Sequence, residues 1–136
     1  MYPEELVYPM RKQLTDQGFI ELRSSDEVDN IMSNSGTTLV VVNSVCGCAA
    51  ANARPGAISS LTNLKKPDHL TTTFAGVDKE AVEKVRYYLA PFPPSSPAIA
   101  LFKNGELVHM LERHHIEGRS AEIISQNLIG AYNEYC

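Results

Sequence analysis

A run of apolar and β-branched residues that ends at two closely spaced cysteines constrains this chain more than any other feature. Residues 37–43 read Thr-Thr-Leu-Val-Val-Val-Asn, a composition typical of a central strand covered on both faces. Cys46, Gly47 and Cys48 follow at once, and the alanines of residues 49–51 then favour a helix. The sequence therefore predicts a buried strand that leads directly into a helix, with the cysteine pair at the junction.

Helical and strand patterns alternate along the rest of the chain. Helices are expected over residues 3–17, 24–33, 49–61, 78–89 and 120–136, and strands over residues 19–22, 69–75, 98–103 and 107–112. We expect Pro9 to start or bend the first helix, and Pro55 with Gly56 to interrupt the third. Asn104-Gly105 is a strong signal for a hairpin between the last two strands. This order predicts an α/β domain of three layers, with a mixed central sheet, flanking helices and a C-terminal antiparallel hairpin.

Residues at helix ends refine these boundaries. Ser24 followed by Glu27 three residues later is a capping box, which predicts a helix start. Asp78 and Ser120 are expected to cap the two later helices with their side-chain oxygens. Ile123 is expected on the core face of the last helix.

Length and charge exclude several classes of protein. The 136 residues predict one domain over residues 1–136, with a helical extension at about residues 1–17. Twelve basic and sixteen acidic residues give a net charge of −4 without a basic cluster, so no nucleic-acid partner is expected. No apolar run is long enough to cross a bilayer, and Glu4 and Glu5 interrupt any secretory signal. We therefore expect a cytoplasmic protein with no membrane partner.

The position of the cysteine pair predicts its chemistry. A helix N-terminus presents unpaired N–H groups and the positive end of the helix dipole. These groups stabilise a thiolate, which lowers a cysteine pKa from about 8.5 toward or below neutrality. We expect Cys46 to be the nucleophile and Cys48 to reach its sulfur, since Gly47 permits a tight turn. A disulfide across so short a loop gains little from restricting the unfolded chain, so it is readily reduced.

Two other interpretations of the cysteines remain. They could be buried thiols that act as small apolar side chains. They could also bind zinc together with His114 and His115. One Cys-x-Cys unit is a weak zinc signature, and adjacent histidines at a strand end are expected to point apart. The sequence therefore predicts no metal.

A proline before the predicted hairpin provides a second anchor. Ser96-Pro97 precedes an apolar run and then Phe-Lys-Asn-Gly-Glu, which resembles the hairpin of the thioredoxin fold. The resemblance implies that Pro97 is cis and packs against Cys46. It also implies that Gly47, Ser96 and Pro97 help to bind an incoming disulfide chain through backbone hydrogen bonds. The alternative is an ordinary trans proline at the end of a loop.

Several longer motifs resemble one family of bacterial thioredoxin-like proteins, the bacilliredoxins, along essentially the whole chain. These are Val-Val-Asn-Ser-Val-Cys-Gly-Cys-Ala-Ala (41–50), Ala-Arg-Pro (53–55), Phe-Ala-Gly-Val-Asp-Lys-Glu (74–80), Pro-Ser-Ser-Pro (94–97) and Cys136. Thioredoxins themselves carry Cys-x-x-Cys after an aromatic residue, which this chain lacks. The resemblance implies that Cys46 removes bacillithiol, a cysteine-bearing sugar thiol, from mixed disulfides on client proteins. Bacillithiol would be a co-substrate, and no cofactor is expected.

Two further residues are assigned auxiliary roles. Cys136 is either a free surface thiol or, if the last helix docks it near the pair, a group that resolves Cys46 or joins a dimer. Arg54 is either a solvated helix residue or a source of positive potential at the site.

Three function classes follow from these residues. The first is a redoxin that removes bacillithiol, with modified client proteins and a low-molecular-weight thiol as partners. The second is a broader disulfide isomerase or reductase that uses the same pair. The third is a non-catalytic redox sensor or metal-binding module. In each case we expect a monomer or a weak homodimer.

Overall fold

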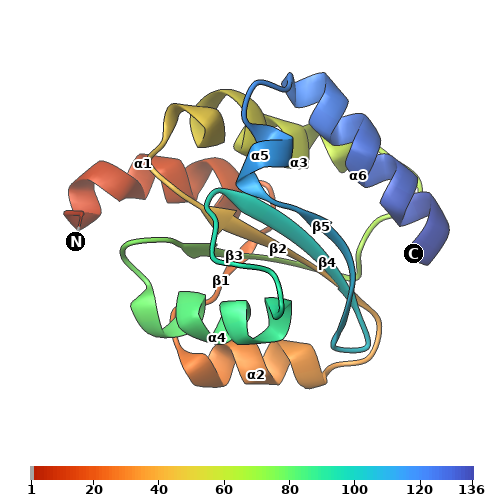
Figure 1. Cartoon of the computed structure of the whole chain (residues 1–136), viewed down its shortest axis with the longest axis horizontal. Helices are drawn as coiled ribbons and strands as arrows, with labels where there is room; N and C mark the ends of the chain where they lie inside the picture. Colours follow the sequence, from red (N-terminus) through yellow and green to blue (C-terminus); the bar gives the residue numbers. More distant parts are fainter. Residues whose placement is uncertain (1) are drawn as a thin grey trace.

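A five-stranded mixed sheet forms the centre of the computed structural model, which describes residues 2–136 (Figure 1). Its strands are β1 (Ile20–Glu21), β2 (Thr37–Asn43), β3 (His69–Phe74), β4 (Ala98–Lys103) and β5 (Glu106–Leu111). They lie in the order β1-β3-β2-β4-β5. The first three are parallel, whereas β4 and β5 are antiparallel to their neighbours. The predicted sheet, with parallel crossovers first and a hairpin last, is confirmed.

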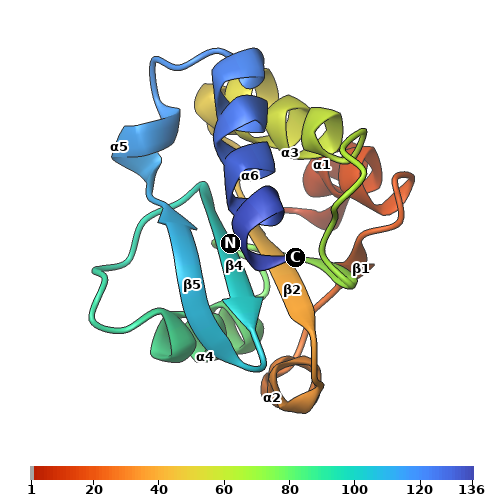
Figure 2. The ribbon, with the colours of Figure 1, turned by 90° about the vertical axis from the view of Figure 1, so that its right-hand side faces the viewer.

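Helices cover both faces of this sheet. They are α1 (Glu4–Thr15), α2 (Ser25–Ser33), the π-helix η1 (Ala49–Ala53), α3 (Arg54–Ser60), α4 (Lys79–Leu89), α5 (Arg113–Ile116) and α6 (Ala121–Tyr135). Figure 1 shows α2 and α4 on one face and α1, α3 and α6 on the other. In the view turned by 90°, α2 and α4 again lie on the side of the sheet away from α3 and α6 (Figure 2). The predicted α/β class is therefore confirmed. None of these helices is long and apolar enough to cross a membrane.

The central strand β2 connects the two halves of the core. All seven of its residues are buried, and it pairs with β3 on one side and β4 on the other. Leu39 and Val41 join the apolar cluster beneath α3 and α6, whereas Val40 and Val42 join the cluster beneath α2 and α4. Successive side chains of a strand point to opposite faces, so the middle of a strand buried on both faces is apolar at consecutive positions, here residues 39–42. This explains the uninterrupted run in the sequence.

Two prolines lie inside helices that they were expected to start, bend or interrupt. Pro9 is exposed within α1, which begins at Glu4, so the carbonyl that loses its partner can face water. Pro55 and Gly56 lie within α3, directly after the π-helical turn. The wider turn moves the preceding carbonyls away from the proline ring and removes the clash that would otherwise break the helix. The predicted interruption was therefore wrong.

The C-terminal segment differs from its predicted form in two places. The short helix α5 was not expected, because its four residues carry no apolar period. Ile123 is exposed, whereas Ile124 and Leu128 are buried. The i, i+4 spacing of the latter two defines the core face of α6, and Ile123 lies about 100° away from it. The predicted caps at Ser24 and Ser120 are confirmed, since each hydroxyl accepts a backbone N–H three residues on, at 3.2 Å.

A buried ion pair joins α1 to the start of α4. Arg11 donates two hydrogen bonds of 2.8 Å to the Asp78 carboxylate, and the Phe74 amide donates a third at 3.0 Å. Asp78 is the N-cap residue of α4, as predicted, but its side chain makes no capping hydrogen bond. Its carboxylate instead neutralises an arginine that α1 brings from 67 residues away. Both side chains are at most 5% exposed.

Replacing Arg11 by Met should strongly destabilise the protein. The substitution keeps an apolar stem but leaves the Asp78 carboxylate buried without its main partner, which costs about 3–5 kcal/mol. The exposed pair between Lys12 of the same helix and Asp16 provides a matched control, and Lys12→Met should leave the free energy of unfolding nearly unchanged. Urea denaturation followed by circular dichroism measures both free energies of unfolding. Equal losses in the two variants would contradict the structural role of the buried pair.

The same ion pair should affect how the free energy of unfolding depends on pH under acidic conditions. Burial alone would raise the pKa of the Asp78 carboxyl, but hydrogen bonds from Arg11 and Phe74 and the charges of Arg11 and Arg23 hold it below its ordinary value. A lowered folded-state pKa gives stability that is present above the unfolded pKa of about 3.9 and is lost as the pH falls through the folded value. The free energy of unfolding should therefore fall less steeply below pH ~4 in Asp78→Asn than in the unmodified chain. If the free energy of unfolding falls with the same slope in both proteins, the lowered pKa of Asp78 is contradicted.

Candidate active site

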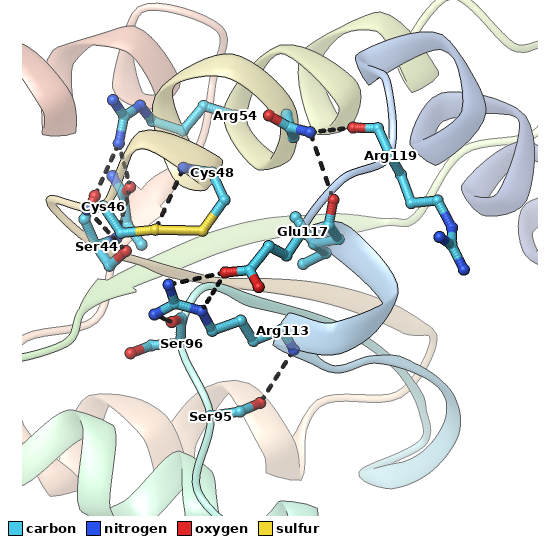
Figure 3. The surroundings of a disulfide bond; sticks show 12 residues. Ser44, Cys46, Cys48, Arg54, Ser95, Ser96, Arg113, Glu117 and Arg119 are labelled. Carbon is cyan, nitrogen blue, oxygen red and sulfur yellow. Dashed lines mark hydrogen bonds and ion pairs between the residues drawn. A yellow bond between two sulfur atoms is a disulfide. The ribbon is translucent and has the colours of Figure 1, made fainter.

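The cysteine pair lies where the carboxyl end of β2 turns into a helix. Cys46 and Cys48 form a disulfide, with their Cα atoms 5.4 Å apart (Figure 3). Helical backbone begins at residue 47 and continues through η1 and α3. The backbone N–H of Cys48 donates to the sulfur of Cys46 at 3.2 Å. The sulfur thus occupies the place that an N-cap oxygen takes in other helices.

This arrangement has a direct chemical consequence. A backbone donor and the positive end of a helix dipole stabilise negative charge on the atom they face. Here both act on Cys46, whose carbonyl also accepts the N–H groups of Ala49 and Ala50. Both cysteines are half-buried and Gly47 is exposed. The site can therefore hold a thiolate at residue 46 after reduction and still admit a disulfide from outside.

A buried arginine, Arg54, stabilises the turn that carries Cys46 through hydrogen bonds. The Arg54 guanidinium donates from Nη1 to the Asn43 side chain at 2.8 Å and to the Ser44 carbonyl at 3.0 Å. Its Nε donates to Gln13 of α1 at 2.6 Å. Arg54 is 3% exposed, so the interpretation of it as a solvated helix residue was wrong. Burial lowers the pKa of Arg54, but an arginine remains charged in proteins, so it adds positive potential beside the site.

Further hydrogen bonds order the residues between the strand and the cysteines. The Asn43 side-chain oxygen accepts the Ser44 N–H at 2.9 Å, while its amide donates to the Met10 carbonyl at 3.1 Å. The Ser44 hydroxyl in turn accepts the Cys46 N–H at 3.3 Å. Contacts from α1 therefore support the active-site turn through Asn43 and Arg54. The position of the Cys46 sulfur depends on these contacts.

A pocket of about 270 Å³ opens beside Cys46. Its lining includes Ser44, Ser96 and the side chains of Arg86 and Arg113, but not Cys48. A reactant that enters from this pocket therefore meets Cys46 first. Nothing in the sequence singles out the two arginines, because Arg86 belongs to an amphipathic helix and Arg113 to the helix that was not predicted.

The predicted proline lies next to this pocket. The Ser96–Pro97 peptide bond is cis, as the resemblance to the thioredoxin hairpin implied. Pro97 is buried at the start of β4, and Ser96 lines the pocket together with Cys46. Arg113 donates from Nη1 to the Ser96 carbonyl at 3.3 Å, which orders this backbone (Figure 3). The binding roles of Gly47, Ser96 and Pro97 stay predictions.

Comparison with known proteins agrees with this geometry. A family model described as disulphide isomerase matches residues 2–136. The bacilliredoxin of Cytophaga hutchinsonii is 58% identical over 134 residues, which cover 98% of this chain and 99% of the relative. That of Halalkalibacterium halodurans is 56% identical over 136 residues, which cover 99% and 94%. The chain belongs to the bacilliredoxin family. It is a thiol-disulfide oxidoreductase.

Solved structures show that the chain has the thioredoxin fold. Oxidised thioredoxin from Plasmodium falciparum aligns with a TM-score of 0.59 at 21% identity, covering 85% of this chain and 98% of that chain. Mitochondrial thioredoxin 3 from Saccharomyces cerevisiae also aligns with a TM-score of 0.59, at 14% identity and with coverage of 90% and 98%. At such identities the likeness concerns the fold alone, and the predicted thioredoxin-like architecture is confirmed.

The histidines that were considered as zinc ligands lie together on α5. Their rings are 4.0 Å apart between centroids, so the expectation that they point apart was wrong. Within residues 2–136, the group of metal-type ligands that comes together is Glu112, His114 and His115, and it contains neither cysteine. The Glu112 N–H donates to Nδ1 of His115 at 3.0 Å, which places the proton of the neutral ring on Nε2. His115 therefore offers no free lone pair to a metal in this arrangement.

Cys136 lies far from the cysteine pair. Burial, the largest effect, and the charge of Asp68 raise the pKa of its thiol, against a hydrogen bond involving Thr37. Thr37 begins β2, and Cys46 follows the other end of that strand. Six steps of a β-strand separate residues by about 20 Å. The last helix thus does not dock Cys136 near Cys46, and within one chain it cannot resolve that sulfur.

The two cysteines should react differently with an alkylating agent. In a reduced Cys48→Ala variant, Cys46 keeps the backbone donor and the pocket, so iodoacetamide should modify it rapidly even at pH ~6. In reduced Cys46→Ala, Cys48 lacks both and should react at least about tenfold more slowly. Mass spectrometry over time measures the two rates, with Cys136 as the internal standard in each variant. Equal rates, or a faster Cys48, would contradict Cys46 as the nucleophile.

Proposed function

We propose that this oxidoreductase removes bacillithiol from mixed disulfides on client proteins, with Cys46 as the nucleophile. The observation that supports the proposal most is the sulfur of Cys46, which accepts a backbone N–H at a helix start and borders a pocket of about 270 Å³. A pocket of this size suits a small thiol better than a folded chain. The bacilliredoxin relatives, at 50–58% identity, support the same reaction.

The first step exchanges one disulfide for another. The Cys46 thiolate attacks the bacillithiol sulfur of the modified client. A bond forms between these two sulfurs, the bond to the client sulfur breaks, and the client leaves as a thiolate that takes a proton from water. Positive potential from Arg54, whose guanidinium is fixed to the Ser44 carbonyl, stabilises negative charge at the attacking sulfur.

The second step releases the small thiol. Cys48, deprotonated, attacks the sulfur of Cys46, bacillithiol leaves as a thiolate, and the Cys46–Cys48 disulfide remains. The client disulfide has then been reduced by two electrons, and the cysteine pair has been oxidised by two. Two equivalents of a thiol reductant must restore the pair. The oxidised pair in the structure corresponds to the product of this second step.

Transfer of the bacillithiol group provides the test. A client protein that carries bacillithiol on one cysteine is mixed with the reduced Cys48→Ala variant, and intact-mass spectrometry follows both proteins. The adduct should move to residue 46 as the client thiol appears, since the resolving cysteine is absent. Cys46→Ala should accept no adduct, and Cys136→Ala should behave as the unmodified chain does. An adduct that stays on the client in every variant would refute the proposal.

A broader disulfide isomerase is the second candidate, because the matching family model carries that description. The same cysteine pair would then act on protein disulfides. Refolding of a protein with scrambled disulfides distinguishes the two functions. Restoration of activity at catalytic concentrations, without transfer of bacillithiol in the first assay, would favour the isomerase.

A further inference from the structure

The pocket beside Cys46 has the electrostatic character of an anion site. Two of its lining side chains are arginines, Arg86 from α4 and Arg113 from α5, and none of its lining residues within residues 2–136 is acidic. The chain as a whole carries a net charge of −4. Two arginines thus border Cys46 with no carboxylate among the lining residues, which favours an anionic ligand over a neutral or cationic one.

Arg86 is incompletely paired. Its Nε is shielded from solvent and has no hydrogen-bond partner among residues 2–136. A buried polar atom without a partner costs free energy, and a charged group costs more than a neutral one. The Nε and Nη atoms of an arginine together match the two oxygens of a carboxylate. No hydrogen bond or ion pair engages the Arg86 side chain among residues 2–136, and Arg86 lines the pocket, so a carboxylate bound there would give this guanidinium a partner.

Arg113 is paired, but its partner is exposed and replaceable. Nε and Nη2 contact Glu117 at 3.1 and 3.0 Å, and Nη1 donates to the Ser96 carbonyl (Figure 3). The Glu117 side chain is 60% exposed, so this ion pair is weak. A second anion that enters the pocket competes with Glu117 for the same guanidinium.

We propose that Arg86, assisted by Arg113, binds a carboxylate of the small thiol whose sulfur Cys46 attacks. The inference rests on the proposed function, since it names the class of thiol that the same pocket accepts. Arg86 is a specificity-determining residue in this scheme: it fixes the acid group of the thiol and thereby directs the sulfur to Cys46. Neutral and cationic thiols lack this anchor and are transferred more slowly.

A set of three disulfides tests the charge preference. One client peptide is joined through its cysteine to mercaptopropionate (anionic), mercaptoethanol (neutral) or cysteamine (cationic). Transfer of each thiol to Cys46 is followed by mass spectrometry in the Cys48→Ala background. The ratio of the anionic to the neutral rate is then compared between variants, which cancels the intrinsic reactivity of each disulfide.

Arg86→Gln should lower this ratio about ten- to hundredfold, as expected for the loss of a hydrogen-bonded charge partner. Arg86→Lys keeps the charge without the planar fork and should give an intermediate ratio. Arg119→Gln is the matched control, since Arg119 does not line the pocket, and should leave the ratio unchanged. Glu117→Gln frees Arg113 at an exposed position, where folding is not at risk, and should raise the ratio.

A second series of disulfides tests whether Arg86 recognises a carboxylate of the small thiol or one of the client peptide. Mercaptoethanol is placed on peptides that carry Asp or Asn beside the cysteine, so that only the client charge changes. The proposal is overturned if Arg86→Gln alters the Asp-to-Asn ratio instead of the thiol ratio, or if Glu117→Gln leaves the thiol ratio unchanged. Transfer of all three thiols at ratios independent of Arg86 also overturns it, although the proposed function stands. A failure of Cys46 to accept any thiol, bacillithiol included, refutes the proposed function itself.

Discussion

The buried guanidinium of Arg54 holds the active-site turn in place. A charge removed from water must find partners within the protein, and Arg54 finds them on α1, at the end of β2 and at the Ser44 carbonyl. These contacts fix the path of the chain between the strand and the helix. Because the sulfur of Cys46 is only two residues beyond Ser44, its position relative to the sheet and to the helix N–H groups depends on this one side chain.

The arginines of this protein fall into two groups with different environments. Arg11 and Arg54 are buried and hydrogen-bonded to partners from distant elements. They stabilise the arrangement of α1 against the sheet. Arg86 and Arg113 border the pocket instead, and their guanidinium groups are unpaired in part or paired only at the surface. Carboxylates neutralise Arg11, whereas neutral oxygens of Gln13, Asn43 and Ser44 bind the buried charge of Arg54. The charge of Arg54 therefore adds to that of Arg86 and Arg113 around the site.

Much of the fold could be predicted because its signals are short. The apolar run of β2, the Asn104-Gly105 turn and the serine caps each act within a few residues, and the structure confirms them. The errors have local physical causes as well. A π-helical turn accommodated Pro55, and α5 is too short to show a helical period. In both cases the backbone departs from the regular geometry on which a periodic pattern depends.

The sequence by itself determined the reactive unit: a strand, a cysteine pair and a helix in direct succession place a sulfur at a helix N-terminus through neighbouring residues alone. Tertiary structure alone decided what surrounds that sulfur. Arg11 pairs with Asp78, which is 67 positions away in the sequence. Arg54 is buried although its local sequence also allowed an exposed position. Arg86 and Arg113 lie beside the pocket. Contacts between residues so far apart depend on how whole elements pack, and no local spacing in the chain encodes them.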